Sequence, residues 1–96
     1  MAAYVIAEIE VKDQARYADY VALGRPVLER YGARVLAAGG EVAAFEGAPK
    51  GSRVVVIEFP SLEAARRWYD SADYAPAKAI RLEASEAVVF AVDGLA

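Results

Sequence analysis

The chain has 96 residues, 11 of them basic and 14 acidic, which gives a net charge of −3 at neutral pH. Basic and acidic residues are interspersed, which argues against nucleic-acid binding because a phosphate backbone requires a clustered positive surface. The chain has no cysteine and no histidine, which excludes disulfides, thiolate metal sites and a Ser–His–acid triad, and no carboxylate cluster suits an all-oxygen metal site; we expect no metal and no cofactor.

The first element in the chain is a predicted β-strand from Ala3 to Val11. Val5, Ala7, Ile9 and Val11 alternate with more polar positions, a period of two that is typical of a strand. The segment has no basic start, and its apolar run is interrupted by Glu8, so we expect a strand and not a signal peptide. No apolar run is long enough to cross a membrane, and we expect a cytoplasmic protein.

A helix is predicted to follow, with Asp13 as its N-cap and Gly32 as its stop just after Tyr31. Its apolar residues recur at steps of three and four and form one stripe. Pro26 should remove a backbone hydrogen bond and kink the helix, or divide it into two shorter helices.

Two strands and a loop are predicted in the middle of the chain. A short strand spans 33–38, and the Gly39–Gly40 pair that follows indicates a turn or bulge. The apolar run 41–46 is a possible additional strand, and 47–52 is a loop. The strongest strand pattern in the chain is 53–59, with three consecutive valines.

Two more helices and a strand complete the predicted order. Ser61 is a good N-cap for a helix over the following residues, and a third helical segment runs from Tyr74 to Ala84. The last strand spans 86–93. We expect residues 1–96 to form one domain.

This order predicts an α+β fold of the ferredoxin-like split βαβ type, a sandwich with helices on one face of a mixed sheet. We expect the strands 3–11 and 53–59 to lie side by side and parallel at its centre. The other face, with Ile6, Val54 and Val56, is too apolar for water, and the composition is 57% hydrophobic. Two copies that pair these faces would bury the excess and form a homodimeric α+β barrel; a monomer with one solvated face is the alternative.

Several motifs in order resemble the DUF1330 family of small bacterial proteins. They are EGAPKGSRVVVIEF, then EFPSLEAARRWYDSADYAPAKAIR, then VVFAVDG, and the resemblance covers nearly the whole chain. It implies a dimeric α+β barrel and no particular reaction. The wider superfamily is similar to cofactor-free monooxygenases, small isomerases and haem-handling proteins.

Glu8 and Glu58 are the candidate catalytic residues. Both are predicted on the face that meets the second copy, on neighbouring strands. Two nearby carboxylates in a poorly solvated site would repel, which would raise one pKa toward a value useful for proton transfer. The alternative is that each reaches solvent at a strand end or pairs with an arginine.

Four residues are candidates for ligand binding: Tyr20, Trp68, Tyr74 and Arg81. Tyr74 and Arg81 are seven residues apart, so they project from one side of the third helix. Arg81 could hold an anion, or form a structural ion pair with Glu58 or another acidic residue. Trp68 and its neighbour Tyr69 either line a pocket or pack in the core, and the same choice applies to the first-helix tyrosines, among which Tyr20 is most central.

The leading functional hypothesis is a homodimer that binds a small organic molecule in a mostly apolar cavity between sheet and helices, with Glu58 nearby. The first alternative is a cofactor-free oxygenase or isomerase that uses Glu58 or Glu8 for proton transfer. The second is a structural dimer with a filled interior and no ligand.

Overall fold

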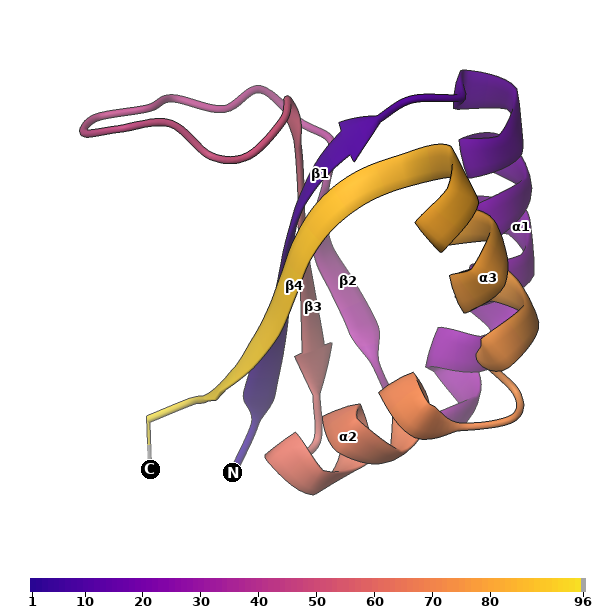
Figure 1. The fold of residues 1–96 in the computed structure, drawn as a ribbon. Coiled ribbons are helices and arrows are strands. Elements are labelled where there is room, and N and C mark those ends of the chain that lie inside the picture. The colour runs from indigo at the N-terminus through magenta and orange to yellow at the C-terminus, as the bar shows by residue number, and fades with distance from the viewer. Residues whose placement is uncertain (96) are drawn as a thin grey trace.

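Strand β1 (Ala3–Val11) is central in a four-stranded sheet whose order is β2-β3-β1-β4. The computed structural model describes residues 1–95 and places three helices on one face of this sheet (Figure 1). Along β1, Ala3, Val5, Ala7 and Ile9 are buried against the helices, and the residues between them are more exposed. The period-two pattern in the sequence therefore separates an inner face from an outer face, as predicted.

The outer face of the sheet, called the open face below, is apolar although no helix covers it. The strand register places its residues together on β1, β3 and β4: Tyr4, Ile6, Glu8, Val54, Val56, Glu58, Val88, Phe90 and Val92. Val88, Phe90 and Val92 are each nearly half exposed.

Helix α1 (Gln14–Arg30) begins and ends where the sequence predicts. The Asp13 carboxylate accepts a hydrogen bond from the backbone N–H of Arg16 at 3.0 Å, and Gly32 has a left-handed φ of 71° just after the last turn. The helix continues through Pro26, so the alternative of two shorter helices is wrong.

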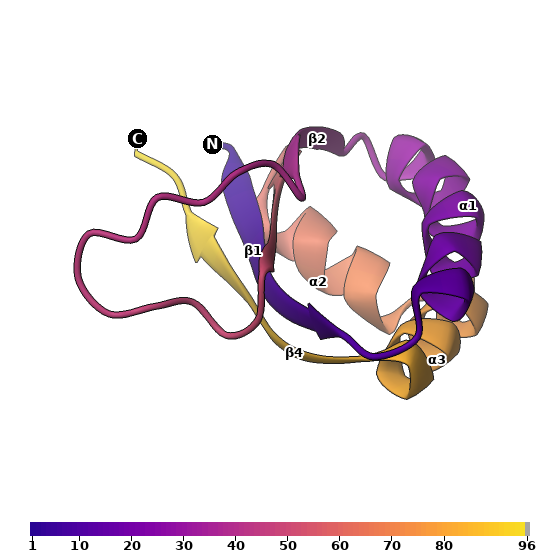
Figure 2. The same ribbon diagram turned by 90° about the horizontal axis from the view of Figure 1, so that it is seen from above.

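Strands β2 (Arg34–Ala38) and β3 (Arg53–Phe59) are joined by a loop, 39–52, that extends away from the sheet (Figures 1 and 2). The possible strand at 41–46 is wrong: this segment is exposed loop, and Phe45 is 92% exposed. This segment cannot pair with β3, which already has a partner on each side, β2 and β1.

The predicted parallel pairing of the two central strands is also wrong, because β1 and β3 are antiparallel. A helical crossover returns the chain so that β2 runs in the same direction as β1. The 39–52 loop then reverses the chain, so β3 runs opposite to both. All neighbouring strands are antiparallel as a result, while the ferredoxin-like α+β plan itself is confirmed.

Helices α2 (Leu62–Asp70) and α3 (Ala75–Ala84) follow β3, and β4 (Ser85–Asp93) ends the sheet. The Ser61 hydroxyl accepts from the backbone N–H of Ala64 at 3.0 Å, which confirms the predicted N-cap. Tyr74, predicted as the first residue of the third helix, is the N-cap of α3. None of these helices, nor α1, has the length and apolar composition to cross a bilayer within residues 1–95.

The helices cover the inner face unequally. Helix α2 lies close to the sheet, where Trp68 packs on Phe59 and Tyr74 with ring centroids 5.2 Å and 4.3 Å apart. Helix α1 instead packs mainly along α3, on the far side from the strands (Figure 2). Tyr17 and Val27 near the two ends of α1 still reach buried clusters with sheet residues.

We predict that Gly51→Ala destabilises the fold far more than Gly47→Ala. Both glycines have a φ of 69°, but a Cβ on Gly51 would collide with the backbone carbonyl of Ile9 in β1, whereas Gly47 has open space around it. The left-handed conformation should cost each variant about 1 kcal/mol, and the collision should add roughly 1–3 kcal/mol to Gly51→Ala. Urea unfolding measures both values, and equal losses would contradict this packing of the loop on β1.

Candidate functional site

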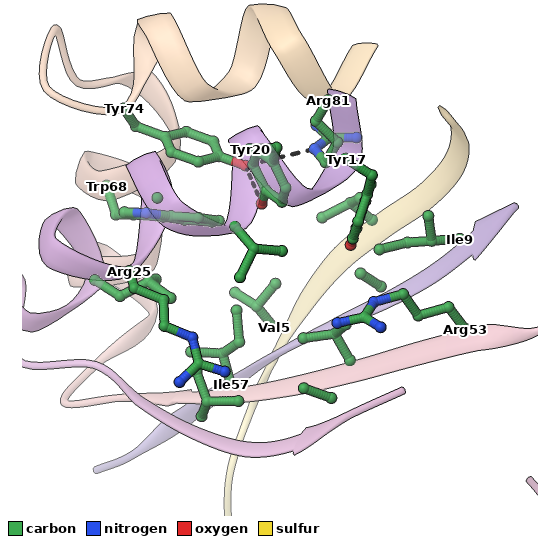
Figure 3. Close-up of a pocket in the computed structure, with 18 residues that line it drawn as sticks. Val5, Ile9, Tyr17, Tyr20, Arg25, Arg53, Ile57, Trp68, Tyr74 and Arg81 are labelled. Atoms are coloured by element: carbon green, nitrogen blue, oxygen red, sulfur yellow. Dashed lines mark hydrogen bonds between the residues drawn. The ribbon is translucent and has the colours of Figure 1, made fainter. Parts of the chain in front are cut away.

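A cavity of about 60 Å³ lies between the inner face of the sheet and helix α1. It exists because α1 is supported by α3 and stands off the strands. Figure 3 shows its lining, which comes from all three helices and from every strand of the sheet. The space suits a few water-sized groups, and the exposed lining residues Arg25 and Ala38 place its opening between α1 and β2.

The structure brings all four predicted ligand-binding residues, Tyr20, Trp68, Tyr74 and Arg81, to the lining of this cavity. The Tyr20 and Tyr74 hydroxyls are 2.9 Å apart and share a hydrogen bond. Arg81 Nε donates to the Tyr74 hydroxyl at 3.4 Å (Figure 3). These contacts link α1 to α3 across one wall of the cavity.

Arg81 is a buried cation without a countercharge in the part of the chain that the structure describes. It is only 5% exposed, and no carboxylate of residues 1–95 forms an ion pair with it. Burial opposes its charge, but the hydrogen bond with Tyr74 and the neighbouring tyrosine hydroxyls outweigh burial, so the pKa of Arg81 lies above its usual value. The expected structural pair with Glu58 does not form.

Trp68 packs in the hydrophobic core and also lines the cavity, so both interpretations of this residue from the sequence apply. Its ring is 3% exposed and packs in the main hydrophobic cluster. Its indole N–H is buried and has no acceptor among residues 1–95. Trp68 also borders a wider groove of about 290 Å³ between α2 and β4, which includes the oppositely charged Arg66 and Asp70.

Tyrosine hydroxyls account for much of the remaining polarity of the lining. Burial raises the pKa of Tyr20 strongly, and the Tyr74 hydroxyl beside it adds to this effect. Burial also raises the pKa of Tyr17, although Arg53 acts in the opposite direction. Tyr31 lies outside the lining and donates to Asp73 at 3.4 Å.

Two arginines in the lining were missed by the sequence-based prediction. Arg53, the first residue of β3, pairs in register with Ile9 and therefore faces inward, and its guanidinium lies over the Tyr17 ring at 5.1 Å. Arg25 extends toward the cavity from α1 on the opposite side of the opening (Figure 3). The sequence could have predicted this position. Arg53 is two residues before Val55 and four before Ile57, so the alternation of side chains along β3 places all three on the inner face.

The two predicted catalytic carboxylates are not brought together, and neither lines the cavity. Glu8 lies opposite Val54, and Glu58 lies opposite Tyr4; at about 3.3 Å per residue, the two are roughly 13 Å apart along the strands. Glu58 pairs with an arginine, as the alternative expected, whereas the partner of Glu8 is a backbone N–H.

Those partners account for both carboxylates. Glu58 accepts from Arg34 at 3.0 Å and from the Tyr4 hydroxyl at 3.5 Å. Glu8 accepts from the Lys50 backbone N–H at 2.8 Å. Glu58 is therefore not near the cavity, contrary to expectation, because its neighbours Ile57 and Phe59 take the inward positions on β3.

We predict that the protein loses stability as the pH rises above about 10, the value at which unfolded tyrosine ionises. Folded Tyr20 has a raised pKa and keeps its proton there, whereas the unfolded chain releases it, so the unfolded state binds fewer protons. Tyr20→Phe should make the decline shallower. Denaturant unfolding between pH 8 and about 12 measures the slope, and an unchanged slope would contradict a buried Tyr20 hydroxyl.

The fold is shared with several solved structures. A protein of unknown function from Rhodopseudomonas palustris superposes with a TM-score of 0.77 at 19% identity, covering 99% of this chain and 83% of that one. A protein from Jannaschia sp. CCS1, described as a dimeric ferredoxin-like protein of unknown function, gives 0.74 at 11% identity over 98% of this chain and 100% of its own. SnoaB from Streptomyces nogalater, a cofactor-independent oxygenase, gives 0.68 at 12% identity over 99% and 94%.

At these identities the likeness shows a common fold alone. None of the curated proteins matches the chain. Residues 2–95 match the sequence family described as a domain of unknown function, DUF1330. Since this match spans nearly every residue, the chain belongs to the DUF1330 family.

Proposed function

We propose that this protein is a homodimer that binds a small organic molecule in the cavity between sheet and helix α1. The observation that carries the proposal is the convergence of Tyr20, Trp68, Tyr74 and Arg81 on one cavity. Apolar and aromatic walls with a few polar groups at fixed positions are typical of ligand sites.

Binding fits the lining better than proton transfer by a carboxylate does. Within residues 1–95 the lining contains no aspartate or glutamate, and Glu8 and Glu58 are on the opposite face of the sheet. The phenols of Tyr17 and Tyr20 have raised pKa values, so they remain protonated hydrogen-bond partners near neutral pH. Such groups can orient a ligand without exchanging protons with it.

The apolar open face supports the proposed homodimer. Ile6 on β1 lies between Val56 on β3 and Phe90 on β4, so the three form one apolar row across the sheet. Pairing this row with that of a second copy would remove it from water. The Jannaschia protein is described as dimeric, which supports self-association of this chain.

We predict that Phe90→Glu converts the dimer to a monomer. Phe90 is 46% exposed on the open face, and a carboxylate there would be buried against the second copy without a partner. Leu82→Glu is the matched control, because Leu82 is 62% exposed on α3 and lies outside the open face. Sedimentation equilibrium gives the mass of each variant. A wild-type monomer, or a dimer that persists in Phe90→Glu, would contradict this interface.

We predict that Arg81→Met and Tyr74→Phe release a ligand that copurifies with the wild-type dimer. Each change removes a polar group from the cavity and keeps most of the side-chain volume. Arg30→Met, an exposed change on α1 with the same loss of charge, should retain the ligand. Native mass spectrometry of gently purified protein reports subunit number and bound mass together. Wild-type dimers that carry no extra mass would count against the binding function.

A further inference from the structure

The charges around the cavity are all of one sign. Arg25, Arg53 and Arg81 contribute to its lining, and no acidic residue does so within residues 1–95. None of the three forms an ion pair with a carboxylate in that range. The whole chain carries more acidic than basic residues, so this local excess of positive charge is not a consequence of composition. A half-buried cation without a countercharge favours an anion as its partner.

Arg53 is the arginine that is best placed to receive that anion. Its guanidinium lies over the Tyr17 ring on one side, and on another it lies so close to Gly39 that a Cβ there would collide with Nη1. The guanidinium is thus held in place by packing. Even so, its Nε is buried without a hydrogen-bond partner among residues 1–95. A positioned guanidinium with unused donors matches the two oxygens of a carboxylate.

We propose that the ligand is a small organic carboxylate and that Arg53 is the residue that selects its negative charge. This inference rests on the proposed binding function. The carboxylate lies at the opening of the cavity, on Arg53 and opposite Arg25. The body of the ligand extends inward over Val5, Ile57 and Val89 toward the Tyr20–Tyr74 hydroxyl pair.

The volume of the cavity limits the size of this body. About 60 Å³ corresponds to roughly four to six water-sized groups at 10–15 Å³ each. A short branched aliphatic acid fits this limit, whereas an acid with several rings does not fit without movement of α1. Isobutyrate and isovalerate are therefore suitable probes, and their amides are matched neutral controls of nearly equal shape.

Trp68 supplies the readout, because it is the only tryptophan in the chain and its ring lines the cavity. Each probe is titrated into the wild-type protein, freed of any copurified molecule, while the Trp68 fluorescence and its single indole N–H resonance are followed. Isobutyrate and isovalerate should shift both signals saturably, and the amides should bind at least about tenfold more weakly, since hydrogen bonds to charged groups contribute about 1.5–3 kcal/mol.

Substitutions at Arg53 test its role directly. Arg53→Gln should weaken carboxylate binding by roughly tenfold or more and remove the preference over the amide. Arg53→Lys should keep part of the carboxylate binding, since lysine keeps the positive charge but lacks the planar guanidinium that contacts both oxygens. Arg30→Gln makes the same change in net charge away from the cavity and should bind like wild type.

Gly39→Ala tests the placement of the guanidinium without removing its charge. The new Cβ should displace Arg53 and weaken carboxylate binding. Gly47→Ala is the control for the strain of a left-handed residue, because its surroundings are open. Urea unfolding of each variant verifies that it is folded before binding is measured.

Three results would overturn the inference. If acids and amides bind equally, or if Arg53→Gln binds isobutyrate as wild type does, the cavity remains a binding site but its selection of anions is refuted. If no acid shifts the Trp68 signals, the carboxylate assignment is refuted. The binding function itself fails separately, through absence of bound mass in native mass spectrometry of the wild-type dimer.

Discussion

The position of helix α1 is the constraint on which the rest of the molecule depends. A helix over a sheet normally packs its apolar stripe directly onto the strands, but α1 is supported by α3, partly through the hydrogen bond between Tyr20 and Tyr74. Its ends reach the sheet through Tyr17 and Val27. The middle of the helix cannot close the remaining distance, and the cavity is the space that results.

The two faces of one sheet have different roles in this arrangement. The inner face carries the cavity and faces the three helices, and the arginine at the start of β3 lies among its apolar residues. The open face carries the apolar row around Ile6, where a second copy is proposed to pack. Because side chains alternate along each strand, neighbouring residues such as Ile57 and Glu58 serve different faces. A change in strand register by one residue would exchange these two roles.

The secondary structure and the fold class could be predicted because local signals determine them. Asp13, Ser61 and Gly32 define helix ends by their own chemistry, and the alternation in 3–11 defines a strand. Strand direction was predicted wrongly. It depends on how many times the chain reverses between β1 and β3, and the 39–52 loop adds a reversal after the helical crossover. The segment 41–46 has a strand-like composition but no neighbour to pair with beside β3.

The candidate site was predictable only in part. Tyr74 and Arg81 share a helix, so their spacing placed them together, and Tyr20 and Trp68 lie on the apolar stripes of their helices. Glu8 and Glu58 were expected to meet, but separation along paired strands depends on register, which the sequence does not reveal. The role of Arg53 depends on its contacts with Tyr17 and Gly39, which are distant in sequence.

The edge strand β2 has a consequence for how molecules reach the interior. It is the shortest strand, it bonds to β3 on one side only, and its register shifts between Val35 and Ala37. Moving β2 outward would widen the gap beside α1. It would break only the backbone hydrogen bonds between β2 and β3, and those that join β3, β1 and β4 would remain. Such local opening requires less free energy than global unfolding. The sheet can therefore open at this margin while its central strands stay intact.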